Sequence, residues 1–344
     1  MTERLRTQRE LNRALLARQL LLERVRLPIP RALERMGCLQ DQYAPSGYIG
    51  LWSRLDGFER DELTRALEDR SVVQATLMRE TIHLVSRDDF WPLALATRRA
   101  RREWWLRVHK SARERDVAAA AERLRAFLGE RPRTRKEIVE LLGRDGFLGV
   151  PHWLDLVRVP PSGTWERRRA DLYALAETWV GPPPALSEDT ALPLLVQRYL
   201  GAFGPARQAD IAAWSGVPVS MLRPTFDRLP LRRFRDDGGK ELLDVDDAPL
   251  PAADAPVPAR LLPTWDAMLL THARRTGILP ERYRSRVFNT RTPQSVSTFL
   301  VDGAVAGTWR AEDSRIALEP FGRLPREARQ QLEEEARALE RLIG

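Results

Sequence analysis

Residues 189–247 carry the local pattern that most constrains the fold, because three short helical segments lead directly into two strands joined by a glycine-rich turn. Apolar spacing and capping signals predict helices at residues 191–203, 206–214 and 220–229, and strands at 231–235 and 241–245. We expect Ser220 to cap the third helix. Three helices followed by a hairpin make a winged helix, which we place at residues 187–250.

Basic residues occupy the parts of this unit that a winged helix normally presents to DNA. Its third helix usually enters the major groove, and its hairpin contacts phosphates or the minor groove. The candidate DNA-binding residues here are Arg223, Arg228, Arg233 and Lys240. The alternative is a winged helix used only for packing or for a protein contact, since a fold does not fix a function.

A second copy of the unit is predicted at residues 113–186. Its first helix is expected at residues 117–128, and a capping box from Thr134 to Glu137 opens the second. A third helix near residues 151–156 leads into a basic hairpin at residues 157–169. The alternative for that basic stretch is a solvated surface loop.

The remaining segments complete the expected architecture. At residues 1–112 we expect a first unit, with helices at 11–25, 28–36 and 61–67 and with β-branched residues that predict a strand or hairpin at 72–85. A small α+β domain is expected at residues 258–344, with a hairpin turning at Asp302-Gly303 and a closing helix at 325–343. The predicted fold class is therefore mainly α with small β-hairpins (α+β), built as three tandem winged-helix units plus a small C-terminal β-containing domain.

The charge balance favours a polyanionic partner. Lysine and arginine number 56 against 48 aspartate and glutamate residues, a formal charge of +8. Such a balance allows DNA, RNA and an anionic membrane surface. No run of about 18 apolar residues predicts a membrane span, and the N-terminal MTERLRTQRE lacks the apolar core of a secretory signal. We therefore expect a cytoplasmic protein that does not bind membranes.

Several kinds of chemistry lack sequence support. Cys38 is the one cysteine, which excludes an intramolecular disulfide and a cysteine-rich zinc site. The histidines do not have metal-ligand spacing; they are His83, His109, His152 and His272. Phosphate-binding, dinucleotide-binding and serine hydrolase motifs are also missing from the sequence. We expect no structural metal and no cofactor.

Four short segments occur in an order that suggests a known family. They are LQDQ at 39–42 with GLWSRL at 50–55, ATLMRETIHLV at 75–85, LPTWD at 262–266 and VDGAVAGTWR at 301–310. Together they resemble a family of bacterial winged-helix DNA glycosylases that includes the azinomycin-resistance glycosylase, which acts on interstrand crosslinks. The resemblance spans nearly the whole chain.

This resemblance implies an activity and a site. Members excise N7-alkylated purines from double-stranded DNA, some unhook interstrand crosslinks, and we expect a monomer to do so here. The catalytic pair maps onto Gln40 and Gln42, and Arg79, Thr81 and His83 become candidates for the DNA-facing surface. The alternatives are glutamines that cap the preceding helix or bind backbone, and a hydrogen-bonded core histidine.

Two glutamines can perform this chemistry only on a suitable substrate. An amide has no useful proton affinity, so it cannot be a strong general base. An N7-alkylpurine already carries a positive charge and leaves readily. Two carbonyls at positions i and i+2 of an extended segment can align one water with the anomeric carbon. We therefore predict a monofunctional glycosylase that uses water rather than a lysine as its nucleophile.

Asp41 separates the two glutamines at a position where the relatives usually have an apolar residue. Alternation along an extended segment predicts that its side chain points away from the glutamine face, where it is exposed or caps the next helix. Turned inward, it could act as a base. The alternative function for the whole chain is a non-enzymatic winged-helix DNA-binding transcription regulator, which would need no glutamine pair and would usually be a symmetric dimer.

Overall fold

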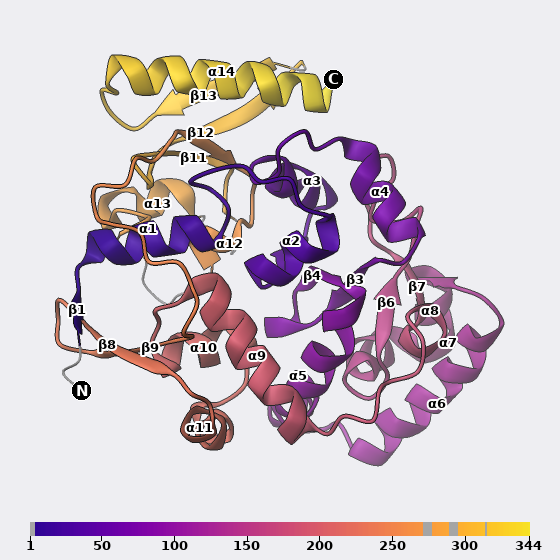
Figure 1. The fold of residues 1–344 in the computed structure, drawn as a ribbon. Helices are drawn as coiled ribbons and strands as arrows, with labels where there is room; N and C mark the ends of the chain where they lie inside the picture. The colour runs from indigo at the N-terminus through magenta and orange to yellow at the C-terminus, as the bar shows by residue number, and fades with distance from the viewer. Residues whose placement is uncertain (1–3, 271–276, 289–294, 314) are drawn as a thin grey trace.

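The computed structural model describes residues 4–270, 277–288, 295–313 and 315–344, and His272 lies outside them (Figure 1). The first helices are α1 (Gln8–Arg18), α2 (Ile29–Met36), α3 (Ala44–Trp52), α4 (Arg60–Glu68), α5 (Arg87–Val108), α6 (Glu114–Glu130) and α7 (Arg135–Gly149). They are followed by α8 (Ala176–Trp179), α9 (Glu188–Phe203), α10 (Gln208–Ser215), α11 (Val219–Arg228), α12 (Ala267–Leu270), α13 (Arg284–Val287) and α14 (Arg326–Ile343). Short 3-10 turns are η1 (Met78–Glu80), η2 (Val150–His152) and η3 (Glu281–Tyr283).

The strands form three sheets. One has the order β2 (Leu39–Gln40), β4 (Ile82–Ser86), β3 (Val72–Thr76), β6 (Leu156–Arg158), β7 (Leu172–Leu175) and β5 (Arg133–Thr134). A second has the order β1 (Arg4–Arg6), β8 (Arg232–Asp236) and β9 (Glu241–Asp244). The third consists of β10 (Arg260–Leu262), β11 (Thr298–Val301), β12 (Ala304–Glu312) and β13 (Arg315–Pro320). The described chain is therefore a mixed α/β protein, as the sequence predicted at this coarse level.

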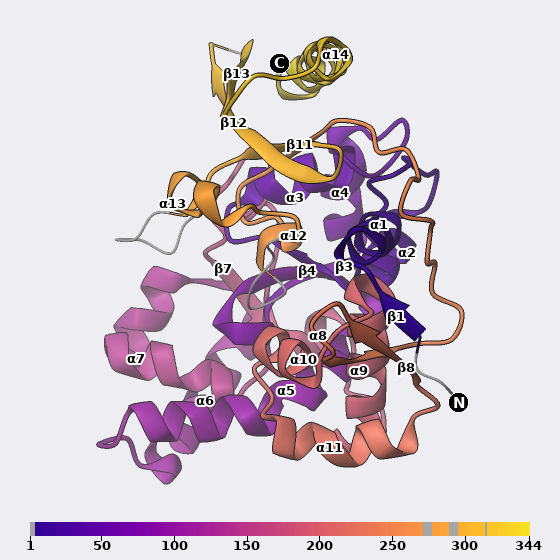
Figure 2. The same cartoon turned by 90° about the vertical axis from the view of Figure 1, so that its left-hand side faces the viewer.

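The six-stranded sheet crosses a predicted boundary. Strand β3 pairs antiparallel with β6, so strands from residues 1–112 and 113–186 share one sheet. Strand β1 pairs parallel with β8, which brings the start of the chain to the hairpin at residues 232–244 (Figure 2). Local sequence patterns had suggested separate small hairpins, because they carry no information on pairing between distant strands.

The element order at residues 188–244 is confirmed. Helices α9, α10 and α11 are followed by the antiparallel hairpin β8–β9. The predicted cap at Ser220 is wrong, because α11 already begins at Val219 after Pro218. The buried stripe of α11 contains Leu222 and Phe226, which join one core cluster with side chains of α5 and α9.

Two other helix predictions need correction. Helix α1 ends at Arg18 rather than at residue 25, and Leu20 has a positive φ of 56° that a continuing helix does not allow. The third helix expected near residues 151–156 is only the turn η2 followed by strand β6. Leu156 pairs there with Leu175 of β7, so this apolar residue belongs to a strand and not to a helix. The capping box of Thr134 and Glu137 is confirmed at the start of α7.

The C-terminal segment agrees with its predicted elements. Strands β11 and β12 form an antiparallel hairpin whose turn residues Asp302 and Gly303 have φ values of 48° and 78°. Helix α14 lies beside β13 at the end of the molecule opposite α11 (Figures 1 and 2). No helix among the described residues is both long and apolar enough to cross a membrane.

Candidate active site

The two glutamines lie at the edge of the six-stranded sheet. Strand β2 is the edge strand, and its Gln40 pairs with His83 of β4. The next residue, Asp41, donates its amide N–H to the carbonyl of Ile82 at 2.7 Å. The glutamine segment is thus fixed beside residues 81–83 by backbone pairing, which brings together the motifs at 39–42 and 75–85.

Both glutamine carbonyls accept a hydrogen bond from the neighbouring turn. The Gln40 side chain is buried, and its Oε1 accepts from Nη2 of Arg79 at 3.0 Å. The exposed Gln42 accepts at its Oε1 from the amide of Ile82 at 3.2 Å, which is the backbone contact considered as an alternative. A carbonyl oxygen has two lone pairs, so each retains capacity for one further donor such as water.

Arg79 stands on a strained turn. Arg79 and Glu80 have φ values of 51° and 58°, which is the left-handed backbone conformation. For a residue other than glycine, this conformation costs about 1–3 kcal/mol. The guanidinium of Arg79 also donates from Nη1 to the carbonyl of Trp214 in α10 at 3.1 Å. Burial lowers the pKa of Arg79. The arginine thereby links the glutamine strand to α10.

Thr81 and His83 point into the protein around the same turn. The hydroxyl of Thr81 donates to the carbonyl of Met78 at 3.0 Å. His83 is 1% exposed, and its Nδ1 lies 2.9 Å from the carbonyl of Thr81. Burial, with the nearby charge of Arg79, lowers the pKa of His83 to about 3. The imidazole is therefore a neutral, hydrogen-bonded core group in this structure, and its contact with DNA stays a prediction.

Asp41 is buried, at 2% exposure, so the expectation of an exposed side chain is wrong. Its Oδ1 accepts from the amide of Gly47 at 3.0 Å, in the first turn of α3, which confirms the expected contact with the next helix. Its Oδ2 accepts from the side-chain amide of Gln74 in β3. Burial raises the pKa of Asp41 to about 7, although the two hydrogen bonds act in the opposite direction.

A charged cluster on the other side of the turn was not predicted. Glu80 accepts from Nε of Arg101 at 2.6 Å, and its second oxygen lies 3.3 Å from Nε2 of His152. Burial opposes ionisation of Glu80, but the close contact with His152 and the charge of Arg101 lower its pKa to about 2. The three residues line a 270 Å³ pocket together with Trp104 and Tyr173. Only the run of arginines at residues 98–102 hinted at this cluster.

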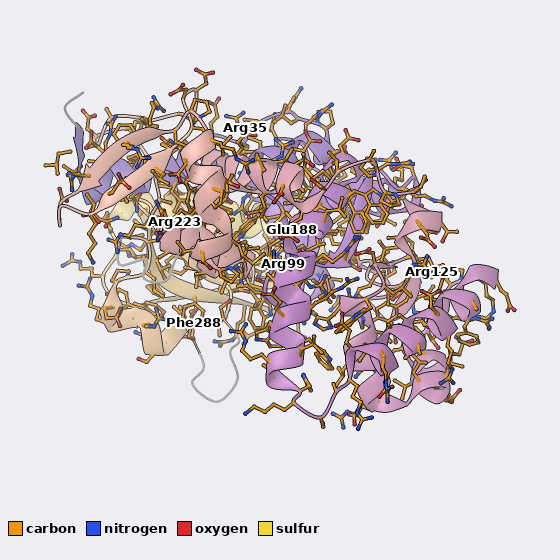
Figure 3. All side chains as sticks on the ribbon, turned by 90° about the horizontal axis from the view of Figure 1, so that it is seen from below. Arg35, Arg99, Arg125, Glu188, Arg223 and Phe288 are labelled. Carbon is orange, nitrogen blue, oxygen red and sulfur yellow. The ribbon has the colours of Figure 1, made fainter. Side chains whose placement is uncertain are left out.

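The four predicted DNA-binding residues of the third unit lie on the surface of α11 and the β8–β9 hairpin. Arg223 and Arg228 are exposed on α11, where Arg228 donates to the carbonyl of Pro224 at 3.1 Å. On the hairpin, Arg233 pairs with Glu241 at 2.7 Å and Lys240 is exposed in the turn. Figure 3 shows Arg223 on the opposite side of α5 from Arg125 of α6.

Comparison with solved structures defines the class of this fold. The Streptomyces sahachiroi DNA glycosylase AlkZ superposes with a TM-score of 0.82 over 98% of this chain and 97% of that one, at 21% sequence identity. The fold is thus that of a bacterial DNA glycosylase.

The sequence then gives the family. Residues 33–342 match the family model described as DNA glycosylase AlkZ-like, and the chain belongs to that family. A curated relative, the interstrand DNA cross-link repair glycosylase of Streptomyces sahachiroi, is 26% identical over 319 aligned residues that cover 83% of each chain. The protein is accordingly a DNA glycosylase, and the family resemblance found in the sequence is confirmed.

Proposed function

We propose that this glycosylase hydrolyses the N-glycosidic bond of cationic N7-alkylpurines in double-stranded DNA and unhooks interstrand crosslinks attached at the same atom. Gln40 and Gln42 would position the attacking water. The observation that carries the proposal is that Arg79 and the amide of Ile82 hold both glutamine carbonyls. The name of the Streptomyces sahachiroi relative supports the crosslink part of the proposal.

The reaction needs little proton transfer from the protein. As the bond between the anomeric carbon and N9 breaks, its electron pair neutralises the positive charge of the purine. Water then adds to the anomeric carbon and releases a proton to solvent. The glutamine carbonyls orient the water and face the developing positive charge on the sugar. Asp41 would not serve as the base, since its side chain is only 2% exposed and is held in the interior by Gly47 and Gln74.

We further propose the domain arrangement and DNA contacts that the sequence suggested. Winged helices would occupy residues 1–112, 113–186 and 187–250, followed by the C-terminal α+β domain at 258–344. The order of helices α9 to α11 and hairpin β8–β9 supports the third unit. The protein would act as a monomer in the cytoplasm, contacting DNA through Arg79, Thr81, His83, Arg223, Arg228, Arg233 and Lys240. Membership in a glycosylase family does not favour the transcription-regulator alternative.

The test is base release from defined duplexes. Wild type, Gln40→Ala and Gln42→Ala are incubated with duplexes containing N7-methylguanine or an N7-linked crosslink, and abasic sites are then cleaved with alkali. Gln330→Ala on the exposed face of α14 is the matched control. We expect release by wild type and the control, and strongly reduced release by the two site variants.

Two results would contradict the proposal in different ways. Wild type that binds the N7-methylguanine duplex but releases no base would exclude this substrate class. Gln40→Ala and Gln42→Ala variants that match wild type would exclude the glutamine site while leaving the substrate intact. A duplex with uracil as a neutral lesion should give no release, because a neutral leaving base requires an acid that two amides cannot supply.

A further inference from the structure

We propose that Glu80 is a positioning residue of the glycosylase reaction. Anchored by Arg101 and His152, it fixes the turn from which Arg79 holds Gln40. The inference rests on the proposed role of Gln40. It assigns a function to the charged cluster that the reaction itself does not use.

The turn between β3 and β4 contains two charged residues, Arg79 and Glu80, whose side chains contact different parts of the protein. The amide of Leu77 donates to the carbonyl of Thr81 at 3.1 Å and closes the turn. Arg79 reaches β2 and α10, whereas Glu80 reaches α5 and η2. Both residues have the left-handed backbone conformation that side chains disfavour, so contacts outside the turn must hold it.

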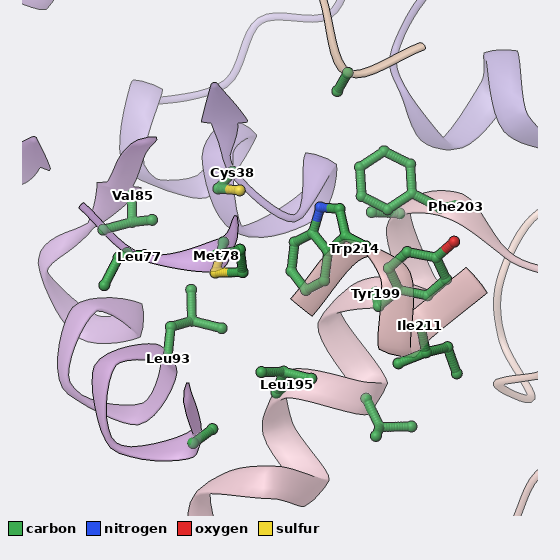
Figure 4. Close-up of a cluster of buried hydrophobic side chains, with 14 of the residues drawn as sticks. Cys38, Leu77, Met78, Val85, Leu93, Leu195, Tyr199, Phe203, Ile211 and Trp214 are labelled. Carbon is green, nitrogen blue, oxygen red and sulfur yellow. The ribbon is translucent and has the colours of Figure 1, made fainter. Parts of the chain in front are cut away.

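Packing fixes the base of the turn but not its tip. Met78 is completely buried, and Figure 4 shows it in the same apolar cluster as Trp214 and Leu93. The tip consists of Arg79 and Glu80, which are only half-buried. Their position therefore depends on polar contacts, which for Arg79 are those to Gln40 and Trp214 and for Glu80 are those to Arg101 and His152.

The partners of Glu80 are themselves immobilised. Nη2 of Arg101 also donates to the carbonyl of Pro151 at 3.3 Å, and Arg102 donates to the carbonyl of His152 at 2.7 Å. These bonds join α5 to η2, the two elements that contact Glu80. The carboxylate thus binds a rigid support, which can hold the strained tip and the guanidinium of Arg79 in place.

Loss of this anchor should affect catalysis more than DNA binding. A small displacement of Arg79 would lengthen its 3.0 Å contact to Gln40 and turn the glutamine carbonyl away from the water. Reaction rates fall by up to about a hundredfold when a reacting group is misplaced by about 1 Å. Glu80→Gln keeps the size of the side chain but removes the charge that Arg101 and His152 bind. We therefore expect it to slow base release by about ten- to hundredfold while DNA affinity stays nearly unchanged.

The experiment compares Glu80→Gln, Arg79→Ala and the double variant in single-turnover release of N7-methylguanine, with DNA affinity and melting temperature measured in parallel. Glu335→Gln is the matched control, because Glu335 binds Arg24 through two contacts of 2.8 Å on α14, away from the turn. We expect the control to lower melting temperature alone. We expect Glu80→Gln to add no further loss in the Arg79→Ala background, since both act through one contact. If Arg79→Ala releases no base, Arg79→Lys takes its place.

Three outcomes would overturn the inference. They are a wild-type rate for Glu80→Gln, an equal loss caused by Glu335→Gln, and full additivity with the Arg79 substitution. These outcomes are distinct from failure of the proposed function. If Gln40→Ala keeps the wild-type rate, the glutamine site is wrong; if Gln40→Ala is inactive and Glu80→Gln is not, only the role of Glu80 is wrong.

Discussion

Asp41, which separates the two glutamines of the candidate site in the sequence, accepts a hydrogen bond from the side-chain amide of Gln74 in the interior of the protein. Each of these two side chains is 2% exposed. Burial raises the pKa of Asp41 from 3.8 to about 7, so the folded protein takes up a proton near neutral pH that the unfolded chain has released. The residue is therefore a source of pH-dependent stability.

Asp41→Asn should remove this dependence. Between pH 4 and pH 7 the folded state holds a proton on Asp41 that the unfolded state lacks, so the contribution of Asp41 to stability falls as pH rises. Asparagine does not titrate and can still accept from Gly47. We expect the free energy of unfolding of Asp41→Asn, relative to wild type, to increase from pH 4.5 to pH 8.

Urea unfolding at a series of pH values measures this difference. The comparison with wild type cancels other titrating groups such as Glu80 and His83. A constant difference between the two proteins across this range would show that Asp41 does not titrate there. Base release by Asp41→Asn should continue, since the proposed reaction assigns no proton transfer to this carboxylate.

His83 should stay neutral throughout the physiological range. Its pKa is lowered to about 3 by burial and by the charge of Arg79, against 6.5 for a free imidazole. Stability linked to His83 is thus fully present above pH 6.5 and is lost as pH falls toward 3. We expect nitrogen chemical shifts of the His83 imidazole, measured by NMR, to remain constant from pH 5 to 8. Titration with a midpoint near 6.5 would show that the ring is exposed to solvent and not buried in the core.

The exposed cations of α11 and the β8–β9 hairpin should set the salt dependence of DNA binding. Each phosphate contact lowers the logarithm of affinity by roughly 0.9 for each unit of log salt concentration. If Arg223 and Lys240 contact phosphates, alanine at either position should reduce that slope by about one and weaken binding to all sequences alike. Fluorescence anisotropy between 50 and 200 mM salt, about the range over which such losses develop, measures the slope. Arg337→Ala on the exposed face of α14 is the control, and an equal change there would remove the assignment to α11 and the hairpin.

The parts of the fold that the sequence predicted are those set by local spacing. The cap of Thr134 on α7 and the turn at Asp302 depend on residues within a few positions, and both are present. Pairing of β3 with β6 joins Gln74 to Arg158 across a long stretch of chain. Hydrophobic periodicity and capping signals carry no information on which distant strand β3 pairs with, so the sequence did not predict the shared sheet.

The candidate site divides in the same way. The glutamine motif and the turn residues Arg79 to His83 were found through family resemblance, and strand pairing does bring Gln40 beside His83. The burial of Asp41 was missed because alternation predicts a direction but not which face is covered. The anchor of Glu80 on Arg101 was missed because its partners come from α5 and η2, which no local motif connects to the turn.

Gly163 provides a last test of how distant segments support the site. It has a φ of 77°, and a Cβ atom there would overlap the side-chain amide of Gln74, with Cδ and Nε2 at 3.0 Å. The end of a glutamine can move, but movement would break its hydrogen bond to Asp41. Gly163→Ala should therefore lower the free energy of unfolding by more than the roughly 1 kcal/mol expected for placing alanine at a positive φ.

Gly57 separates the two contributions, because it has a φ of 72° but no atom within 4 Å of its Cβ position. Gly57→Ala should show the cost of a positive φ alone. The additional loss in Gly163→Ala should be about 1–3 kcal/mol, the typical cost of leaving a buried polar group without its partner. This excess should be larger at pH 8 than at pH 5, since ionised Asp41 needs the donor of Gln74 more than the protonated carboxyl does. Equal losses for the two variants at both pH values would mean that Gln74 finds another position without giving up Asp41.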